Sequence, residues 1–374
     1  MIRLEKSLQR KAIRFWGWFD LPFIISVVAL AGIGLIGIYS ATLNGPSFNL
    51  FSKQMVWLLL GGLIFFFLSL SDYRVLNDHA FTLYSVSIVG LIAVLLFGVE
   101  IHGSRSWIRL AGISLQPSEF AKISLVLVVA RYLSGQSETY LSKTQILVLS
   151  CLTLLPTLLV MLQGDLGTGI TYLPIVVGAM FVAGLTVRIA FTMSILILLS
   201  SPLAWFTLRG YQQQRILATL NPSLDPQGVG YQTSQSVIAI GSSGLTGKGF
   251  GNGFQSQLGF VPEIHSDFVY ALLTEEWGLW GGGLILGLYF ILIHRLTRMG
   301  GHAQDRAGIL LVTGVTSLLG FHVLINIGMA LGICPPVGIP LPLLSYGGSS
   351  TITFMSCLGL ASSVYRRRFV YTDP

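Results

Sequence analysis

VPEIHSDFVYALLTEEWGLWGGGLILGLYFILI, residues 261–293, joins a charged segment to an apolar run that is long enough to cross a lipid bilayer. Glu263, His265 and Asp267 stand at the entrance to that run. A carboxylate at the edge of a bilayer is costly to desolvate, so Asp267 is a candidate functional residue, a general base that its two charged neighbours could tune. A helix cap is the competing explanation, because acidic residues often begin helices.

The rest of the chain has the composition of a membrane protein. Hydrophobic residues make up 53% and charged residues only 10% of the 374 residues, and the mean hydropathy is +0.75. A soluble domain of this length would need more polar surface. The isoelectric point near 9.4 could indicate nucleic acid, but Lys and Arg that orient the spans explain it more simply, so we expect no nucleic-acid partner. The three cysteines lack the spacing of a disulfide framework or a zinc site, and no metal ligands are assigned.

Ten apolar segments of roughly membrane-spanning length predict an all-α polytopic membrane protein with ten transmembrane helices. They cover residues 21–41, 54–71, 81–99, 118–134, 145–162, 168–184, 188–207, 267–293, 308–331 and 347–364. With the N-terminus inside, cytoplasmic segments hold 15 of the 22 Lys and Arg residues, which favours both termini in the cytoplasm. We therefore expect one integral membrane domain over residues 1–374, with a cytoplasmic N-terminus at 1–20 and a cytoplasmic tail at 365–374.

A large extracytoplasmic loop, residues 208–266, separates the seventh and eighth predicted spans. Loops of this length are often functional. Residues 211–220 and 231–243 place polar and apolar residues at helical spacing, which predicts two helices along the membrane surface. The residues between them, 221–226, are typical of a turn. We find no internal repeat, and so no support for an inverted-repeat transporter.

Six of the seven outer cations fall in two regions, residues 103–122 and the long loop, against the positive-inside rule. Snorkelling of a long side chain at the interface could explain Arg209 or Arg215 alone. The excess also fits an anionic ligand at the outer leaflet. Trp107, which follows Arg105 closely, is an interface anchor on the first interpretation and a lid over an amphiphilic ligand on the second.

Glu119 and Lys122 lie near the start of the fourth predicted span. An acid in the first helical turn is stabilised by the helix dipole, which explains Glu119 but not a cation beside it. Residues three apart share a helix face and can pair. An ion pair that faces a cavity near the headgroups could bind a polar substrate. Asp165, before the sixth span, is better explained as a turn or helix cap than as a ligand.

Lys248 and Glu275 are the remaining candidates. Lys248 lies in the glycine-rich segment 244–249, which lacks the residues of a nucleotide-binding P-loop but could contact a phosphate. At roughly 100° per residue, Glu275 lies about 80° from Asp267 around a helix and could line the same cavity. Glu276 lies about 180° away, so we expect it to pack against another helix or bind a polar partner.

A proline-rich segment, residues 334–350, precedes the tenth span. Its prolines exclude a continuous helix and predict an ordered outer loop that shapes the cavity. The small residues of 347–350 allow tight packing where the tenth span begins.

Together these segments resemble the SEDS family of bacterial cell-wall proteins over essentially the whole chain. The motifs that carry the resemblance are Gly103–Ile108, Gln116–Glu119 with Lys122, Asp165–Thr168, Gly230–Gln232 with Gln235–Ser236, His265–Phe268, Glu275–Glu276, and Gly338–Pro342 through Ser345–Ser350. Residues 247–249 and 255–258 look like the elongation-type RodA branch rather than the division-type FtsW branch. Gly164, Ser266 and residues 269–270 depart mildly from the family pattern and leave Asp267 in place.

The resemblance implies a ten-helix peptidoglycan glycosyltransferase in the bacterial inner membrane. It would polymerise lipid II at the outer leaflet during elongation, with a class B penicillin-binding transpeptidase and other elongation-complex proteins as partners. Asp267 would accept a proton from the acceptor sugar. Arg105, Lys122, and also Arg215, Lys248 or a divalent cation such as Mg²⁺ or Mn²⁺, would offset charge on the leaving pyrophosphate.

Two other functions fit the sequence. A lipid II flippase would carry polar groups through the membrane midplane, and Glu275, Glu276 and Asn326 keep that alternative open. A non-catalytic scaffold that activates the transpeptidase is the third. The concentration of polar groups at the outer face favours the polymerase.

Overall fold

The computed structural model describes residues 19–43, 48–101, 103–110, 113–136, 140–207, 210–221, 225 and 228–369. Most of the predicted turn at 221–226, nearly all of the predicted N-terminal segment and the second half of the predicted tail lie outside these residues. The described chain is mostly helical, as the apolar segments predict. Its helices are α2 (Leu21–Thr42), α3 (Phe48–Leu70), α4 (Tyr73–Asp78), α5 (Ala80–Phe97), α6 (Pro117–Ser134), α7 (Lys143–Leu162), α8 (Leu166–Ile170), α9 (Leu173–Val182), α10 (Val187–Thr207), α11 (Gly210–Leu220), α12 (Val229–Gly241), α13 (Phe254–Gln257), α14 (Val269–Gly301), α15 (Arg306–Ala330), α16 (Gly348–Arg366) and a 3₁₀ turn, η2 (Arg367–Phe369).

Each predicted span corresponds to helical structure. Within the described residues, six helices are long and apolar enough to cross a membrane: α2, α3, α5, α7, α14 and α15. This confirms a multi-pass membrane protein. The other four segments form α6, which carries three charged residues, the pair α8–α9, α10 and α16. The sixth predicted span is broken, because α8 ends at Ile170 and Pro174 begins a new helix.

Local sequence accounts for several helix starts. Asp20 accepts a hydrogen bond from the backbone N–H of Phe23 at 3.0 Å and caps α2. Ser142 and Gln145 form a capping box at α7. Asp305 caps α15 through Gly308. These polar caps fix where the three helices begin.

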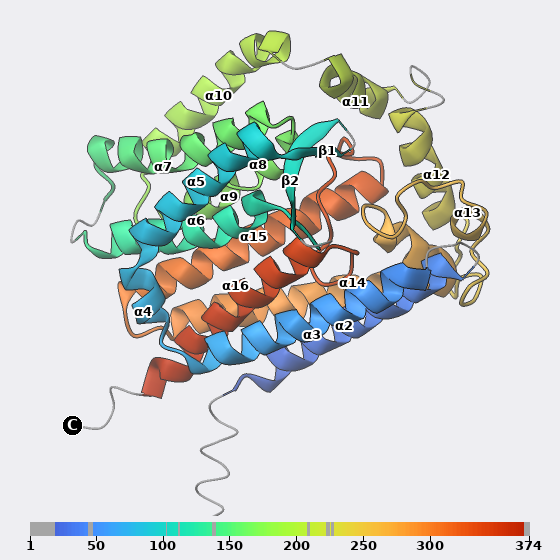
Figure 1. The fold of residues 1–374 in the computed structure, drawn as a ribbon, viewed down its shortest axis with the longest axis horizontal. Helices are drawn as coiled ribbons and strands as arrows, with labels where there is room; N and C mark the ends of the chain where they lie inside the picture. Colours follow the sequence, from blue (N-terminus) through green and yellow to red (C-terminus); the bar gives the residue numbers. More distant parts are fainter. Residues whose placement is uncertain are drawn as a thin grey trace, which may run out of the picture.

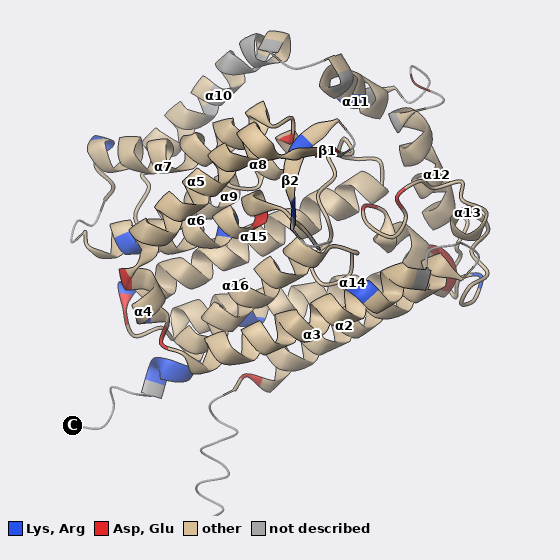
Figure 2. Cartoon of the chain, in the orientation of Figure 1, with Lys and Arg blue, Asp and Glu red and all other residues tan. Residues whose placement is uncertain are grey.

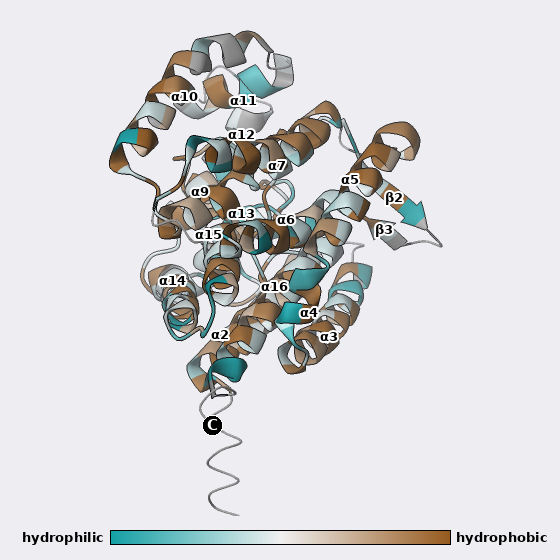
Figure 3. Cartoon of the chain, turned by 90° about the vertical axis from the view of Figure 1, so that its left-hand side faces the viewer, coloured by the Kyte–Doolittle hydropathy of each residue, from teal (hydrophilic) through white to brown (hydrophobic). Residues whose placement is uncertain are grey.

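The centre of the bundle is formed by α6, α15 and α16, whose side chains are mostly buried. Helix α3 packs along α16, α2 and α15 pack against α14, and α5 packs against α6. Large apolar side chains such as those of Phe67, Leu96 and Phe290 are exposed. Figure 3 shows hydrophobic residues along the outer helices of the bundle. An apolar outer surface of this kind suits a lipid environment.

The two ends of the bundle differ in the elements and the charged residues that they carry. The described ends of the chain lie together at one end, where many of the Lys and Arg residues also gather, whereas α11 to α13 and a small sheet lie at the other (Figures 1 and 2). The sheet was not predicted from the sequence. It has three antiparallel strands in the order β1 (Val99–Ile101), β2 (Ser104–Leu110) and β3 (Ile113–Leu115). The two helices predicted in the long loop are present as α11 and α12.

Helix α14 is interrupted at Gly278, whose φ of 71° and ψ of −167° are not helical. A break of this kind removes helical hydrogen bonds. The loop of residues 244–249 replaces them: Lys248 and Gly249 donate their N–H groups to the carbonyls of Glu275 and Glu276 at 3.0 and 2.9 Å. Leu279 in turn donates to the Gly244 carbonyl at 3.0 Å. The long outer loop is thereby fixed to the helix that follows Asp267.

Candidate active site

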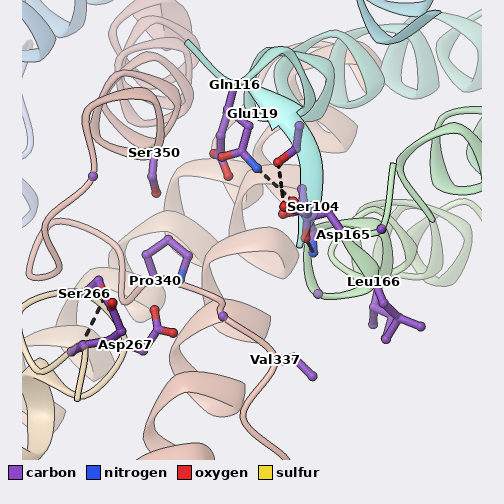
Figure 4. A pocket seen from close by; sticks show the side chains of 18 of the residues that line it. Ser104, Gln116, Glu119, Asp165, Leu166, Ser266, Asp267, Val337, Pro340 and Ser350 are labelled. Atoms are coloured by element: carbon purple, nitrogen blue, oxygen red, sulfur yellow. Dashed lines mark hydrogen bonds between the residues drawn. The ribbon is translucent and has the colours of Figure 1, made fainter. Parts of the chain in front are cut away.

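A cavity of about 610 Å³ lies at the end of the bundle that carries the sheet. It is lined by parts of β2, the starts of α6, α8 and α16, helices α11 and α12, the segment before α14 and the proline-rich loop. The lining residues are Ser104, Ser106, Trp107, Gln116, Glu119, Gly164–Thr168, Ile170, Gln212, Arg215, Ile216, Gln232, Pro262, Glu263, Ser266, Asp267, Pro335, Val337, Gly338, Pro340 and Tyr346–Ser350. Figure 4 shows Asp267 and Ser266 beside Pro340 on one side, with Glu119, Gln116 and Asp165 on the other.

Asp267 lines this cavity as predicted, and it does not occupy the cap position of α14. The helix starts at Val269, and Phe268 occupies the N-cap position without a side-chain capping bond. The segment before it is a tight turn in which Asp267 donates its N–H to the Glu263 carbonyl at 3.0 Å. Glu263 has a φ of 50°, which is uncommon for a residue other than glycine. The geometry therefore weakens the capping explanation.

Asn326 ties Asp267 to the proline-rich loop. The Asn326 amide on α15 is fully buried and donates to the Asp267 carbonyl at 2.9 Å and to the Ile339 carbonyl at 2.8 Å. One side chain thus positions both the candidate base and the loop, which confirms that the loop shapes the cavity. The sequence offered a signal for this role, since a polar residue inside an apolar span is costly unless it has partners.

Glu119 and Lys122 form the predicted ion pair, with Lys122 Nζ 2.6 Å from Glu119 Oε1. Both side chains are almost fully buried, and only Glu119 reaches the cavity wall. His322 on α15 lies on the other side of the ammonium, with Nε2 3.2 Å from Nζ. The second oxygen of Glu119, Oε2, is buried and has no hydrogen-bond partner among the described residues. It is therefore available as an acceptor for a polar ligand.

Asp165 caps helix α8 and also lines the cavity wall. Its Oδ1 accepts from the N–H of Thr168 at 3.0 Å and caps α8, as expected. Its Oδ2 accepts from the Gln116 side chain at 2.9 Å, which joins α8 to the start of α6. Gln116 and Asp165 were not selected as site residues from the sequence, because a capping role explained the acid completely.

The predicted residues of the sheet and of α11 divide into two groups. Trp107 lines the cavity, and Arg215 does so while its Nη1 donates to the Pro336 carbonyl at 3.0 Å. Arg105 is exposed and does not line it, although its N–H binds the Gln163 carbonyl at 2.9 Å. Arg105 instead lies on the exposed part of β2, a strand that was not predicted from the sequence.

Lys248 and Glu275 do not line the cavity, contrary to the expectation that Glu275 could share it with Asp267. Instead Lys248 Nζ binds Glu275 Oε1 at 2.7 Å. Glu275 also accepts from the N–H groups of Gln255 and Ser256 at 2.9 and 3.0 Å, so it organises the folded-back outer loop. Glu276 behaves as predicted: it accepts from the Ser40 hydroxyl on α2 and from the Gly251 N–H.

His265 also lies outside the cavity wall, although it is two residues from Asp267. Its ring packs edge-on against Tyr346, with 5.8 Å between ring centres, and its carbonyl accepts from the Tyr346 N–H at 2.9 Å. Burial lowers the pKa of His265 below 6.5, and Glu263 at 3.9 Å opposes this shift more weakly. The imidazole is therefore neutral at pH 7 and holds the segment by packing rather than by charge.

Comparison with known proteins fits this geometry. A model of the cell cycle proteins FtsW, RodA and SpoVE matches residues 16–369. The chain belongs to this family. It is 38% identical to the peptidoglycan glycosyltransferase MrdB of Escherichia coli K12, over 95% of this chain and 96% of the relative. It is 33% identical to the peptidoglycan glycosyltransferase RodA of Treponema pallidum, over 94% and 98%.

Solved structures of the FtsW, RodA and SpoVE family are also similar. A chain of a peptidoglycan synthase complex, described as coordinating polymerization and crosslinking, matches with a TM-score of 0.82 and 36% identity, over 95% of this chain and 99% of the other. The rod-shape-determining protein RodA of Thermus thermophilus matches with a TM-score of 0.71 and 32% identity, over 95% and 98%. These matches confirm the resemblance to the family and to its RodA branch.

The charge of the cavity wall differs from the expectation for this family member. Within the described part of the chain, four carboxylates line it, Glu119, Asp165, Glu263 and Asp267, against one cation, Arg215. Of the other cations assigned to the leaving pyrophosphate, Lys122 lies behind Glu119, and Arg105 and Lys248 lie elsewhere. The sequence could not show this, because it reveals on which side of a membrane a cation lies and not which way it points.

Proposed function

We propose that this protein polymerises lipid II into glycan strands at the outer leaflet of the bacterial inner membrane, with Asp267 as the general base. Its family and its named relatives make it a peptidoglycan glycosyltransferase with a polymerase role in elongation. Lipid II as the substrate, the inner membrane, the ten spans and the cytoplasmic termini are parts of the proposal. The observation that carries it is Asp267 in the wall of a polar cavity at one end of an otherwise apolar bundle.

The proposed reaction needs one base and one leaving group. The acceptor sugar 4-hydroxyl attacks the anomeric carbon of the lipid-linked donor chain, and Asp267 accepts its proton. Glu119 Oε2 accepts a hydrogen bond from a substrate hydroxyl or amide, held in place by Lys122 behind it. Trp107 in the wall covers the sugar, because aromatic rings pack well against amphiphilic ligands.

A divalent cation stays a prediction. Within the described residues, no three His, Cys, Asp or Glu side chains are grouped so that they could hold a metal. No step of the proposed reaction uses Mg²⁺ or Mn²⁺.

A class B penicillin-binding transpeptidase is the proposed partner, together with other elongation-complex proteins. The support is the similarity to a chain of a synthase complex described as coordinating polymerization and crosslinking. Joining the two reactions in one complex would bring each new glycan strand to the enzyme that crosslinks it.

Asp267→Asn tests the catalytic proposal, with polymer from purified protein and lipid II as the measurement. We expect polymer from the parent and a loss of at least about a hundredfold in the variant, because general-base catalysis commonly contributes that much. Asp78→Asn is the matched control, since Asp78 is an exposed acid paired with Arg131 away from the cavity. We expect it to retain parental activity.

Equal polymer from the parent and Asp267→Asn would exclude Asp267 as the base. No polymer from the parent, even with the transpeptidase added, would favour a flippase or a scaffold. The thermal unfolding temperatures of all three proteins should agree, so that a loss of polymer reports on chemistry.

A further inference from the structure

The first turn of α16 presents unused hydrogen-bond donors to the cavity. Gln54 on α3 accepts from the Gly347 N–H at 3.2 Å. The next three N–H groups, those of Gly348, Ser349 and Ser350, have no acceptor among the described residues, and all three residues line the cavity. No side chain caps this 19-residue helix. Free N–H groups and the positive end of the helix dipole together attract anions.

A second observation points to a ligand at the same place. The Ser350 side chain is only 9% exposed, lines the cavity, and makes no hydrogen bond within the described part of the chain. Figure 4 shows it directed toward the space between Asp267 and Glu119. A hydroxyl that opens on the cavity and has no partner within the described residues can donate to an anionic group that binds there. Ser349, in contrast, already accepts from the Gln116 N–H at 3.1 Å.

The location suits the leaving group of the proposed reaction. The Tyr346 N–H donates to the His265 carbonyl, so the segment that leads into α16 lies against the segment that carries Asp267. Among the described residues, Arg215 is the one cation of the cavity wall, and its guanidinium already donates to the Pro336 carbonyl. Lys122 compensates the charge of the nearby Glu119. Backbone N–H groups therefore take the place of the side-chain cations expected for a pyrophosphate.

We propose that the first turn of α16, through the N–H groups of Gly348, Ser349 and Ser350 and the Ser350 hydroxyl, binds the pyrophosphate of the lipid-linked donor. This rests on the proposed polymerase function. As the acceptor oxygen bonds to the anomeric carbon, the carbon–oxygen bond to pyrophosphate breaks. The electron pair stays on the pyrophosphate oxygen, and the proton passes to Asp267. The fixed dipoles of α16 stabilise the developing negative charge.

Ser350→Asp tests the proposal with farnesyl pyrophosphate as a soluble probe. Aspartate in the first turn of a helix is favourable for the helix itself, so the variant should fold, yet its charge repels a pyrophosphate. We expect affinity at least about tenfold weaker than in the parent, and about threefold weaker in Ser350→Ala. Farnesol, which lacks phosphate, should bind the parent and both variants equally.

Parental affinity for farnesyl pyrophosphate in both Ser350 variants would overturn the proposal. An equal loss of farnesol affinity would overturn it too, because the effect would not depend on phosphate. If Ser350→Asp does not fold, the affinity of Ser350→Ala for farnesyl pyrophosphate decides alone.

Asp267→Asn separates this proposal from the catalytic one: it should lose polymerisation and keep farnesyl pyrophosphate binding. Polymerisation by Asp267→Asn would refute the base and leave the Ser350 result to decide the pyrophosphate site.

Discussion

Lys122 shows at the residue scale how an ion can be kept inside an apolar bundle. Its side chain is 1% exposed, and its ammonium lies between Glu119 at 2.6 Å and His322 at 3.2 Å. His322 Nδ1 lies 2.9 Å from the Leu318 carbonyl, which can only accept, so Nδ1 carries the proton and Nε2 is left to accept from the ammonium. The ammonium thus has a hydrogen-bonded partner on each side, which stabilises a buried charge.

Lys122→Met should lower the free energy of unfolding by about 3 kcal/mol, because it leaves the Glu119 carboxylate buried without a counter-charge. Adding Glu119→Gln should restore part of that loss, since the double variant contains no buried charge. Thermal unfolding in detergent measures both. A double variant that is no more stable than Lys122→Met would contradict a stabilising interaction between the Lys122 and Glu119 charges.

At the element scale, the break in α14 determines where the outer loop attaches to this helix. Residues 244–249 provide the hydrogen bonds that the helix loses at Gly278. A Cβ added at Gly278 would lie 2.3 Å from the Gly247 nitrogen, and the φ of 71° is itself unfavourable for other residues. The loop and the helix therefore fit together only with glycine at these positions.

Gly278→Ala should destabilise the protein by about 2 kcal/mol or more and reduce polymerisation, because the helix that follows Asp267 loses its support. Gly283→Ala is the control, since Gly283 lies in the same helix and an added Cβ there meets no atom within 4 Å. We expect it to be neutral or slightly stabilising. Limited proteolysis of the outer loop, compared between the two variants, measures the effect, and equal cleavage would argue against it.

The arrangement of spans belongs to the scale of the whole molecule. Six described helices are long and apolar enough to cross a membrane, whereas α6, α8–α9, α10 and α16 complete the ten that we propose. The described ends of the chain lie at one end of the bundle, and the cavity lies at the other (Figure 1). An even number of spans puts both ends of the chain on the same side of the membrane, as the described ends are placed here.

Cysteine labelling in intact cells tests the topology. In a variant without Cys151, Cys334 and Cys357, Ser52→Cys should react with a membrane-impermeant maleimide from outside. Gln304→Cys should react only after the membrane is opened. Both positions are exposed and lie in or next to connections between helices, so reactivity reports on the side of the membrane. The reverse pattern would place the cavity in the cytoplasm and exclude the proposed reaction at the outer leaflet.

The amino-acid sequence by itself determined the helical membrane fold, the positions of the apolar helices and the pairing of Glu119 with Lys122, because apolar length and helical spacing are local properties. It also singled out Asp267. Only the tertiary structure decided which polar groups meet. It turned Arg105 away on an unpredicted strand, paired Lys248 with Glu275, and joined Asn326 to Asp267 across a long stretch of chain. These outcomes depend on side-chain direction and on contacts between distant segments, which no local pattern encodes.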